Sequence, residues 1–272
     1  MWISRLIVTG VALALIAILY ILPKVVVDNQ QQENSEAIGE PSNLQISESH
    51  DRQLSESEQA QINDLKQRIH ASSLPEKSAN FADSLAELFS NFNYLDSAAY
   101  YYGQAADMKP DMERRLKAGD SYFEAFSYAV EVQKQHQLGE NARKYFNLAL
   151  EQDPDMFDVK AKVALTFLPD QPMQAVVLLR EVVESEPENE LGLYNLGLLS
   201  IQSQQFNKAI ERFEKLTQSH PGHLEGQFYL GVSYFEAGIK TKARDQFELV
   251  KTMDQDPEVL ASVDEYLEKL KL

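Results

Sequence analysis

The stretch Leu191–His223 reads LGLYNLGLLSIQSQQFNKAIERFEKLTQSHPGH, and a related stretch, HLEGQFYLGVSYFEAGIKTKARDQFELVKTMDQDP, follows from His223 to Pro257. Three markers recur between the two stretches at an offset of 34 residues: Leu196-Gly197 and Leu230-Gly231, Ala209 and Ala243, and Phe213 and Phe247. Because periods of this length mark stacked supersecondary units, the sequence predicts a repeated architecture in which each unit is one small folding element.

Each unit is predicted to form two helices. The first helix carries Leu-Gly at its middle, where a residue without a side chain lets the partner helix approach closely. The second carries an alanine and, four residues later, an aromatic residue, which places both on one helical face. Pro221 then stands where the chain leaves the second helix, a common position for proline just past a helix end.

This combination of markers resembles the tetratricopeptide repeat (TPR) family. Weaker copies precede the two clear ones, and the marker alanines are spaced by 44, 33, 34 and 34 residues: Ala98, Ala142, Ala175, Ala209 and Ala243. The resemblance implies an all-α fold, a TPR α-solenoid of about five helix-turn-helix repeats over residues 79–257 with a capping helix over residues 258–272. About ten extra residues lie between Tyr122 and Ala142, and longer hairpin helices would absorb them.

The N-terminus is predicted to anchor the chain in a membrane over residues 1–27. Its uncharged apolar run, Leu6–Leu22, has 17 residues, the low end of what spans a bilayer as a helix. Trp2 and Tyr20 suit the membrane–water interface. A cleaved signal peptide is the alternative, but no small-x-small cleavage site follows Tyr20, so a retained transmembrane helix is favoured.

The anchor is predicted to be a single span in a bacterial inner membrane, with the repeats facing the periplasm. Arg5 precedes the apolar run and favours a cytoplasmic N-terminus, whereas Lys24 beyond it leaves the cytoplasmic face open as the alternative. Residues 28–56 are rich in Gln, Glu, Ser and Asn and are predicted to form a disordered spacer. An amphipathic helix is expected over residues 57–78, with Ser55 and Glu58 as its capping box.

Composition and motifs argue against catalysis. The chain has 272 residues with 25 Lys and Arg against 42 Asp and Glu, and a net charge of −17 disfavours a nucleic-acid partner. Without cysteine it has no disulfide, no cysteine-ligated zinc and no cysteine nucleophile. It lacks the G-x-S-x-G, H-E-x-x-H and phosphate-loop motifs. His220 and His223 flank a Pro-Gly turn without a third ligand, so no catalytic, cofactor or metal site is predicted.

The resemblance implies that a partner binds on the concave face, which the first helices of the repeats line. The predicted lining is apolar and aromatic with one amide, and comprises Tyr194, Asn195, Leu198, Ile201, Phe228, Tyr229, Val232, Phe235, Leu116 and Phe123. Tyr194 and Phe228 stand where the carboxylate-gripping mode of the family needs cations, so an apolar helix or an extended hydrophobic peptide fits better. For each side chain, packing between neighbouring units or under the capping helix is the alternative.

The leading functional hypothesis is a non-enzymatic, membrane-anchored TPR scaffold or adaptor that binds a protein or peptide partner at the bacterial cell envelope. A tether raises the concentration of the groove near membrane-bound partners. The second hypothesis is a chaperone-like assembly factor, because an anchored TPR chain is similar to periplasmic factors of cytochrome c maturation and to ancillary protein-export subunits. The third is a structural protein that self-associates through the groove or the cap.

Overall fold

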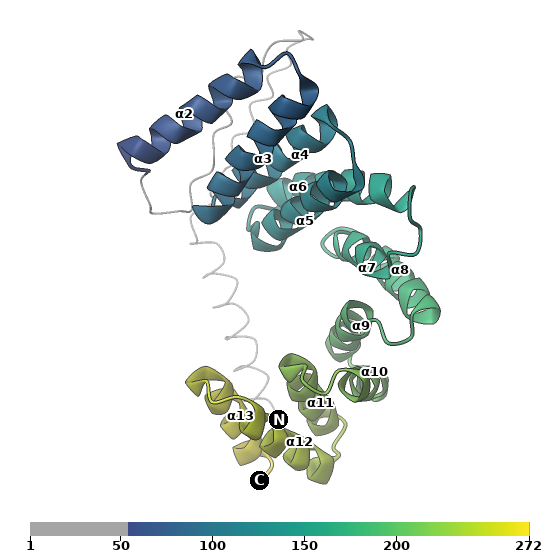
Figure 1. Ribbon diagram of the computed structural model, residues 1–272. Helices are drawn as coiled ribbons and strands as arrows, with labels where there is room; N and C mark the ends of the chain where they lie inside the picture. Colours follow the sequence, from purple (N-terminus) through teal and green to yellow (C-terminus); the bar gives the residue numbers. More distant parts are fainter. Residues whose placement is uncertain (1–53, 272) are drawn as a thin grey trace, which may run out of the picture. The chain divides into compact units, whose positions relative to one another are not determined.

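The computed structural model describes residues 54–271 of the chain, and within this range all regular structure is helical (Figure 1). The predicted anchor and all but the last three residues of the predicted spacer lie outside the described residues. Among the helices that are described, none combines the length and the apolar character that crossing a bilayer requires.

Twelve helices follow one another in the described range, joined by short turns. Their bounds are α2 Glu56–Ala71, α3 Pro75–Asn91, α4 Leu95–Met108, α5 Met112–Tyr128, α6 Val132–Leu150, α7 Phe157–Leu165, α8 Pro172–Ser185, α9 Glu190–Gln202, α10 Phe206–Ser219, α11 Leu224–Glu236, α12 Lys240–Met253 and α13 Pro257–Lys269.

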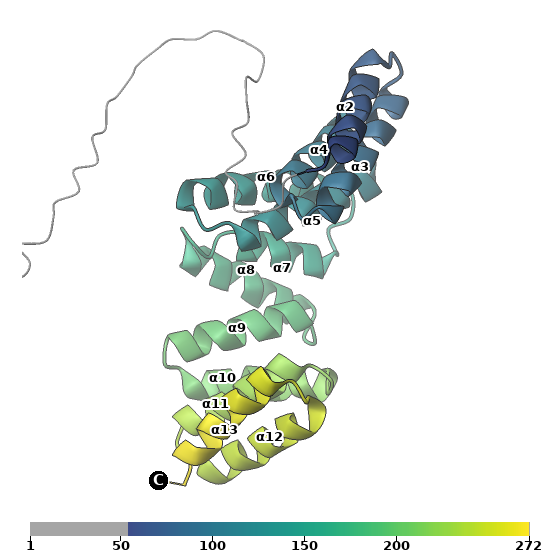
Figure 2. The same cartoon turned by 90° about the vertical axis from the view of Figure 1, so that its left-hand side faces the viewer.

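Consecutive helices from α3 to α12 pair into five hairpins, and the second helix of each hairpin packs against the first helix of the next. The first helices of the last three hairpins, α7, α9 and α11, also contact one another in sequence order. Helix α13 closes the series by packing on α12, as Figure 2 shows. The all-helical repeat architecture predicted from the 34-residue period is therefore confirmed.

In the second, fourth and fifth hairpins, a glycine of the first helix faces a phenylalanine ring of the second helix. A Cβ placed on Gly197 would lie 2.5 Å from Cζ of Phe213, and one on Gly231 would lie 2.8 Å from Cε1 of Phe247. The same contact recurs in the second hairpin between Gly119 and the Phe146 ring at 2.5 Å. The Leu-Gly marker and the Ala-x-x-x-Phe marker are thus two sides of one helix–helix contact, which explains their joint recurrence.

The ten extra residues of the second repeat lengthen its hairpin. Helices α5 and α6 have 17 and 19 residues, against 13 and 14 in α9 and α10. The prediction that longer hairpin helices absorb the insertion is confirmed. The third repeat differs in the opposite direction, since α7, which lacks the Leu-Gly pair, has only 9 residues.

The predicted capping box at the start of α2 is present. The Ser55 hydroxyl accepts the backbone N–H of Glu58, and the Glu58 carboxylate accepts the backbone N–H of Ser55 at 2.8 Å. Helix α2 ends at Ala71 rather than continuing to residue 78, and α3 begins at Pro75. Leu74 is extended, as a residue before proline tends to be, and proline favours the first position of a helix.

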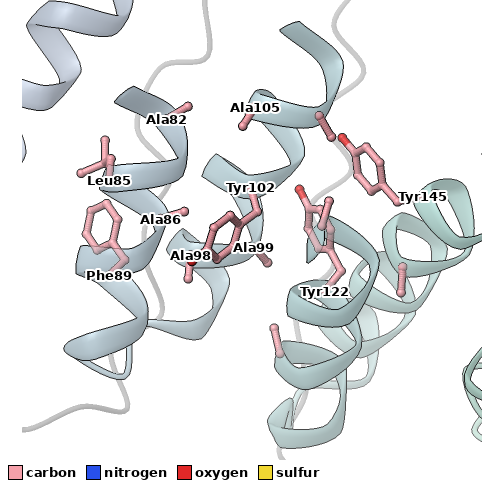
Figure 3. Close-up of a cluster of buried hydrophobic side chains, with 14 of the residues drawn as sticks. Ala82, Leu85, Ala86, Phe89, Ala98, Ala99, Tyr102, Ala105, Tyr122 and Tyr145 are labelled. Atoms are coloured by element: carbon pink, nitrogen blue, oxygen red, sulfur yellow. The ribbon is translucent and has the colours of Figure 1, made fainter. Parts of the chain in front are cut away.

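The core of the first two hairpins is built from small residues and rings. Figure 3 shows the alanines of α3 and α4 facing each other, with Tyr102, Tyr122 and Tyr145 beside them. The side chains of Tyr122 and Tyr145 stack at 5.7 Å between ring centroids. The Tyr145 hydroxyl donates to Asp107 at 3.1 Å, so this buried ring keeps a hydrogen-bond partner. Separate apolar clusters lie under α7–α8 and under α9–α13.

Candidate protein-binding surface

Helices α9 and α11 each present one face on which side chains recur at helical spacing. On α9 these are Tyr194, Leu198 and Ile201, and on α11 they are Phe228, Val232 and Phe235. We call these residues, with Asn195 and Tyr229, the first-helix surface. All but Val232 are half-buried, and Val232 is only 6% exposed. The surface is therefore partly used for packing between the last two repeats and partly open to solvent.

Tyr194 joins the two helices through ring contacts. Its ring stacks on the His223 imidazole at 5.1 Å and meets the Tyr229 ring at 6.1 Å in an edge arrangement. It also meets the Phe213 ring at 6.3 Å. Tyr194 therefore belongs both to the first-helix surface and to the seam between the repeats.

The polar end of this seam is formed by Glu190 and two histidines. The Glu190 carboxylate lies 3.3 Å from Nδ1 of His220 and 3.6 Å from Nε2 of His223. His223 also caps α11, because its Nδ1 accepts the backbone N–H of Gly226 at 3.0 Å. Across the described residues, no group of three or more His, Cys, Asp or Glu side chains could hold a metal ion. The contacts assign both histidines to the turn between repeats.

The amide of Asn195 is partly committed to its own helix. Its Nδ2 donates to the carbonyl oxygen of Leu191 at 2.8 Å. Its Oδ1 accepts no protein hydrogen bond from the described residues and is left as the acceptor of the first-helix surface. A backbone N–H of an extended peptide is the kind of donor that would match it.

The capping helix α13 covers part of the first-helix surface on α11. Tyr266 of α13 stacks on Phe247 at 4.9 Å and meets Phe228 at 5.9 Å and Phe235 at 5.3 Å, both edge-on. For Phe228 and Phe235, packing under the capping helix, which the sequence left open, thus accounts for part of their burial. The contribution of Tyr266 depends on the angle at which α13 packs, and helical periodicity does not specify that angle.

Leu116 and Phe123, predicted to line the same groove, lie on α5 in the N-terminal part of the repeats. Both are half-buried and pack against the N-terminal core, where Phe123 meets Phe126 at 6.0 Å and Phe146 at 6.4 Å. The residues of α9 and α11 pack instead against the C-terminal core. The structure thus brings together eight of the ten predicted residues and places the other two in a different cluster.

Burial of the Tyr194 phenol, with Tyr229 and Glu225 nearby, raises its pKa to about 12. Since the folded pKa lies above the ordinary value of 10.0, folding favours the protonated phenol. The stability that the protonated Tyr194 phenol contributes to the folded state is complete below pH 10 and is lost as the pH rises from about 10 to about 12. Ultraviolet absorbance can be titrated against pH for the intact chain and for the Tyr194→Phe variant. The difference between the two curves should show one phenol that ionises near pH 12. An ionisation near pH 10 would show that this phenol is solvated.

Residues 194–258 match a family model described as the tetratricopeptide repeat. The last two repeats carry the TPR signature. The matched range runs from Tyr194 on α9 to the first turn of α13 and so contains the whole first-helix surface. No curated protein matches the chain.

Several solved structures are similar to parts of this chain. The MamA fragment "41-end" from Desulfovibrio magneticus RS-1 is 20% identical, with a TM-score of 0.49 over 64% of this chain and 94% of its own. YrrB, described as a TPR protein with an unusual peptide-binding site, is 19% identical, with a TM-score of 0.47 over 76% and 98%. A TPR protein from Parabacteroides merdae is 13% identical, with a TM-score of 0.48 over 79% and 91%.

Proposed function

We propose that this chain is a non-enzymatic, membrane-anchored TPR scaffold that binds a protein or peptide partner on the first-helix surface of α9 and α11. The observation that carries the proposal is the set of partly exposed apolar and aromatic side chains on two adjacent first helices, which only the buried Val232 interrupts. Exposed apolar strips of this kind mark interaction sites in soluble domains. The partner chemistry that fits is an apolar helix or an extended hydrophobic peptide.

The uncharged run Leu6–Leu22 supports anchoring in a bacterial inner membrane with the repeats in the periplasm. Because the chain has no cysteine, Lys240→Cys on the exposed start of α12 gives a single labelling site. A membrane-impermeant maleimide should label this variant in intact spheroplasts, and deletion of residues 1–27 should release the protein from washed membranes. Labelling only after lysis would instead indicate the cytoplasmic face, and release of the intact chain by the wash would contradict the anchor.

Partner binding is expected to depend on the rings of Tyr194 and Phe228. In a cross-linked capture from membranes, the Tyr194→Ala/Phe228→Ala variant should retain about a tenth or less of the partner, because removing two aromatic anchors at an interface commonly costs 2 kcal/mol or more. The matched control, Ile239→Ala/Leu249→Ala, removes two exposed apolar side chains of the last repeat and should capture as the intact chain does. Equal capture by both variants, each folded by circular dichroism, would contradict the proposal.

The identity of the captured protein would separate the two forms of the second hypothesis, the chaperone-like assembly factor. Haem-attachment components would support a maturation factor, and newly exported chains would support an ancillary export subunit. Self-association, the third role, predicts instead that sedimentation of the chain depends on its own concentration.

A further inference from the structure

Exposed apolar side chains gather in one part of the repeats. The described residues include eight large apolar side chains classed as exposed, and five of them lie between residues 128 and 177: Tyr128 at 73%, Val130 at 97%, Val132 at 71%, Met173 at 73% and Val177 at 50%. Single exposed apolar residues are ordinary on a protein surface, whereas a group of them marks an interaction site. We call these five residues the hairpin-tip patch.

The long second hairpin explains why part of this patch is uncovered. Tyr128 is the last residue of α5 and Val132 the first of α6, so with Val130 they form the tip of the hairpin that carries the extra residues. The next hairpin starts with the shortest first helix, α7, which has 9 residues. The following hairpin, α7–α8, therefore does not cover the tip, and the side chains of the tip remain exposed.

Contacts link α6, which begins at the hairpin tip, to the α7–α8 turn, which leads into the start of α8. Nε2 of His136 lies 3.6 Å from Oδ2 of Asp170, and the Arg143 guanidinium lies 4.4 Å from the Phe167 ring centroid. Val132 is one helical turn before His136, and Met173 is three residues after Asp170. Figure 2 shows α6 lying next to α7, the first helix of the following hairpin. The hairpin tip and the start of α8 thus flank the same interhelical contact.

Carboxylates surround the patch. Glu131 lies within the tip, Glu140 and Asp170 both face His136, and Glu181 follows Val177 by one turn of α8. No Lys or Arg of the described part of the chain forms an ion pair with any of these four carboxylates, which are Glu131, Glu140, Asp170 and Glu181. Arg143 of α6 lies within electrostatic reach of Glu140 and Asp170, without a direct ion pair to either.

The nearby cations are Lys134, Arg143 and Arg180, and among the described residues only Lys134 has a carboxylate partner outside the patch. Lys134 pairs with Asp96 on α4, and Arg143 donates to the Thr166 hydroxyl at 3.0 Å. Arg180 lies near Arg212 on α10, which carries the same charge and does not neutralise it. The patch is therefore apolar at its centre, and its border carries four carboxylates against two arginines, a net negative charge. A second copy of this chain would bring the same acidic border and be repelled, whereas a cationic partner would be complementary.

We propose that the hairpin-tip patch is a second docking surface, and that its occupant is an amphipathic segment of a partner protein in which apolar residues are flanked by Lys or Arg. The apolar side chains would cover Val130 and Met173, and the cations would lie against the acidic border. This surface is built from α5, α6 and α8, so the proposal does not depend on binding at the first-helix surface of α9 and α11.

The test uses the full chain in phosphatidylcholine nanodiscs, with Gln133→Cys at the tip labelled by an environment-sensitive fluorophore. Since the chain has no cysteine, the label is unique. The probe is a helical peptide of roughly 14 residues made of Leu and Lys, and its control replaces every Lys by Glu. The Lys peptide should bind saturably and more weakly at high salt, and the Glu peptide should bind at least about tenfold more weakly.

Two variants of the labelled chain complete the test. Val130→Asp/Met173→Asp should weaken binding of the Lys peptide at least about tenfold, and the matched control Ile239→Asp/Leu249→Asp should leave it unchanged. Tyr194→Ala/Phe228→Ala should also leave it unchanged, which keeps this result separate from that at the first-helix surface. Equal binding by the Lys and Glu peptides, absence of saturable binding, or unchanged affinity in Val130→Asp/Met173→Asp would each overturn the proposal.

Discussion

Replacing Gly197 with valine is expected to destabilise the C-terminal repeats by about 3 kcal/mol or more, the upper part of the range for overpacking a core. A Cβ at this position would lie 2.5, 2.7 and 2.8 Å from three atoms of the Phe213 ring. The ring is fully buried and belongs to α10, so relief requires the two helices of the hairpin to separate. Chemical denaturation followed by circular dichroism measures the loss.

The matched control is Gly222→Val in the turn before α11. A Cβ there would have no atom within 4 Å, so the change should cost about 0.5 kcal/mol or less. A double variant carrying Gly197→Val and Phe213→Ala should lose less than the sum of the two single variants, because both act on one contact. Additive losses, or a Gly197→Val chain as stable as the control, would show that the glycine does not set the distance between the helices.

Replacing Phe247 with alanine is expected to cost about 4 kcal/mol, within the range for removing a buried phenylalanine. The Phe247 side chain is fully buried, stacks on Tyr266 of α13 and lies against Gly231. Its loss removes the ring on which the capping helix rests. We therefore expect amide hydrogen exchange in α13 to rise by more than in α9, in addition to the loss of global stability.

Leu249→Ala is the control for this prediction, since it removes an exposed apolar side chain two residues away on the same helix. It should cost about 0.5 kcal/mol or less and leave exchange in α13 unchanged. If Phe247→Ala loosens α9 and α13 equally, the capping helix does not depend on this ring more than the rest of the C-terminal core does.

The repeat markers predicted the hairpins because each marker is one half of a local contact. Leu-Gly and Ala-x-x-x-Phe are brought together by a single tight turn, so their spacing alone indicates how the two helices pack. The capping box of Ser55 and Glu58 is predictable for the same reason, since both residues lie within one helical turn. Such contacts can be predicted from the sequence because they form between residues that are close along the chain.

Features that depend on packing between distant elements could not be predicted in the same way. The end of α2 at Ala71 is not such a feature, since Pro75 is a local signal that the predicted range of 57–78 overran. Val232 occupies a first-helix position equivalent to Leu198 but is buried, whereas Leu198 is half-buried. The exposure of Val130 follows from the short α7 next to the long second hairpin, which requires both hairpins to be in place.

The measurement that tests the central claim most directly is cross-linking from defined positions of the full chain in its membrane. A photo-reactive amino acid replaces Asn195 on the first-helix surface in one variant and Lys215, which is exposed on α10, in another. If α9 and α11 bind the partner, the variant at position 195 should give a discrete cross-linked product that is absent at position 215. A product at position 215 alone would contradict the account and assign binding to the second helices.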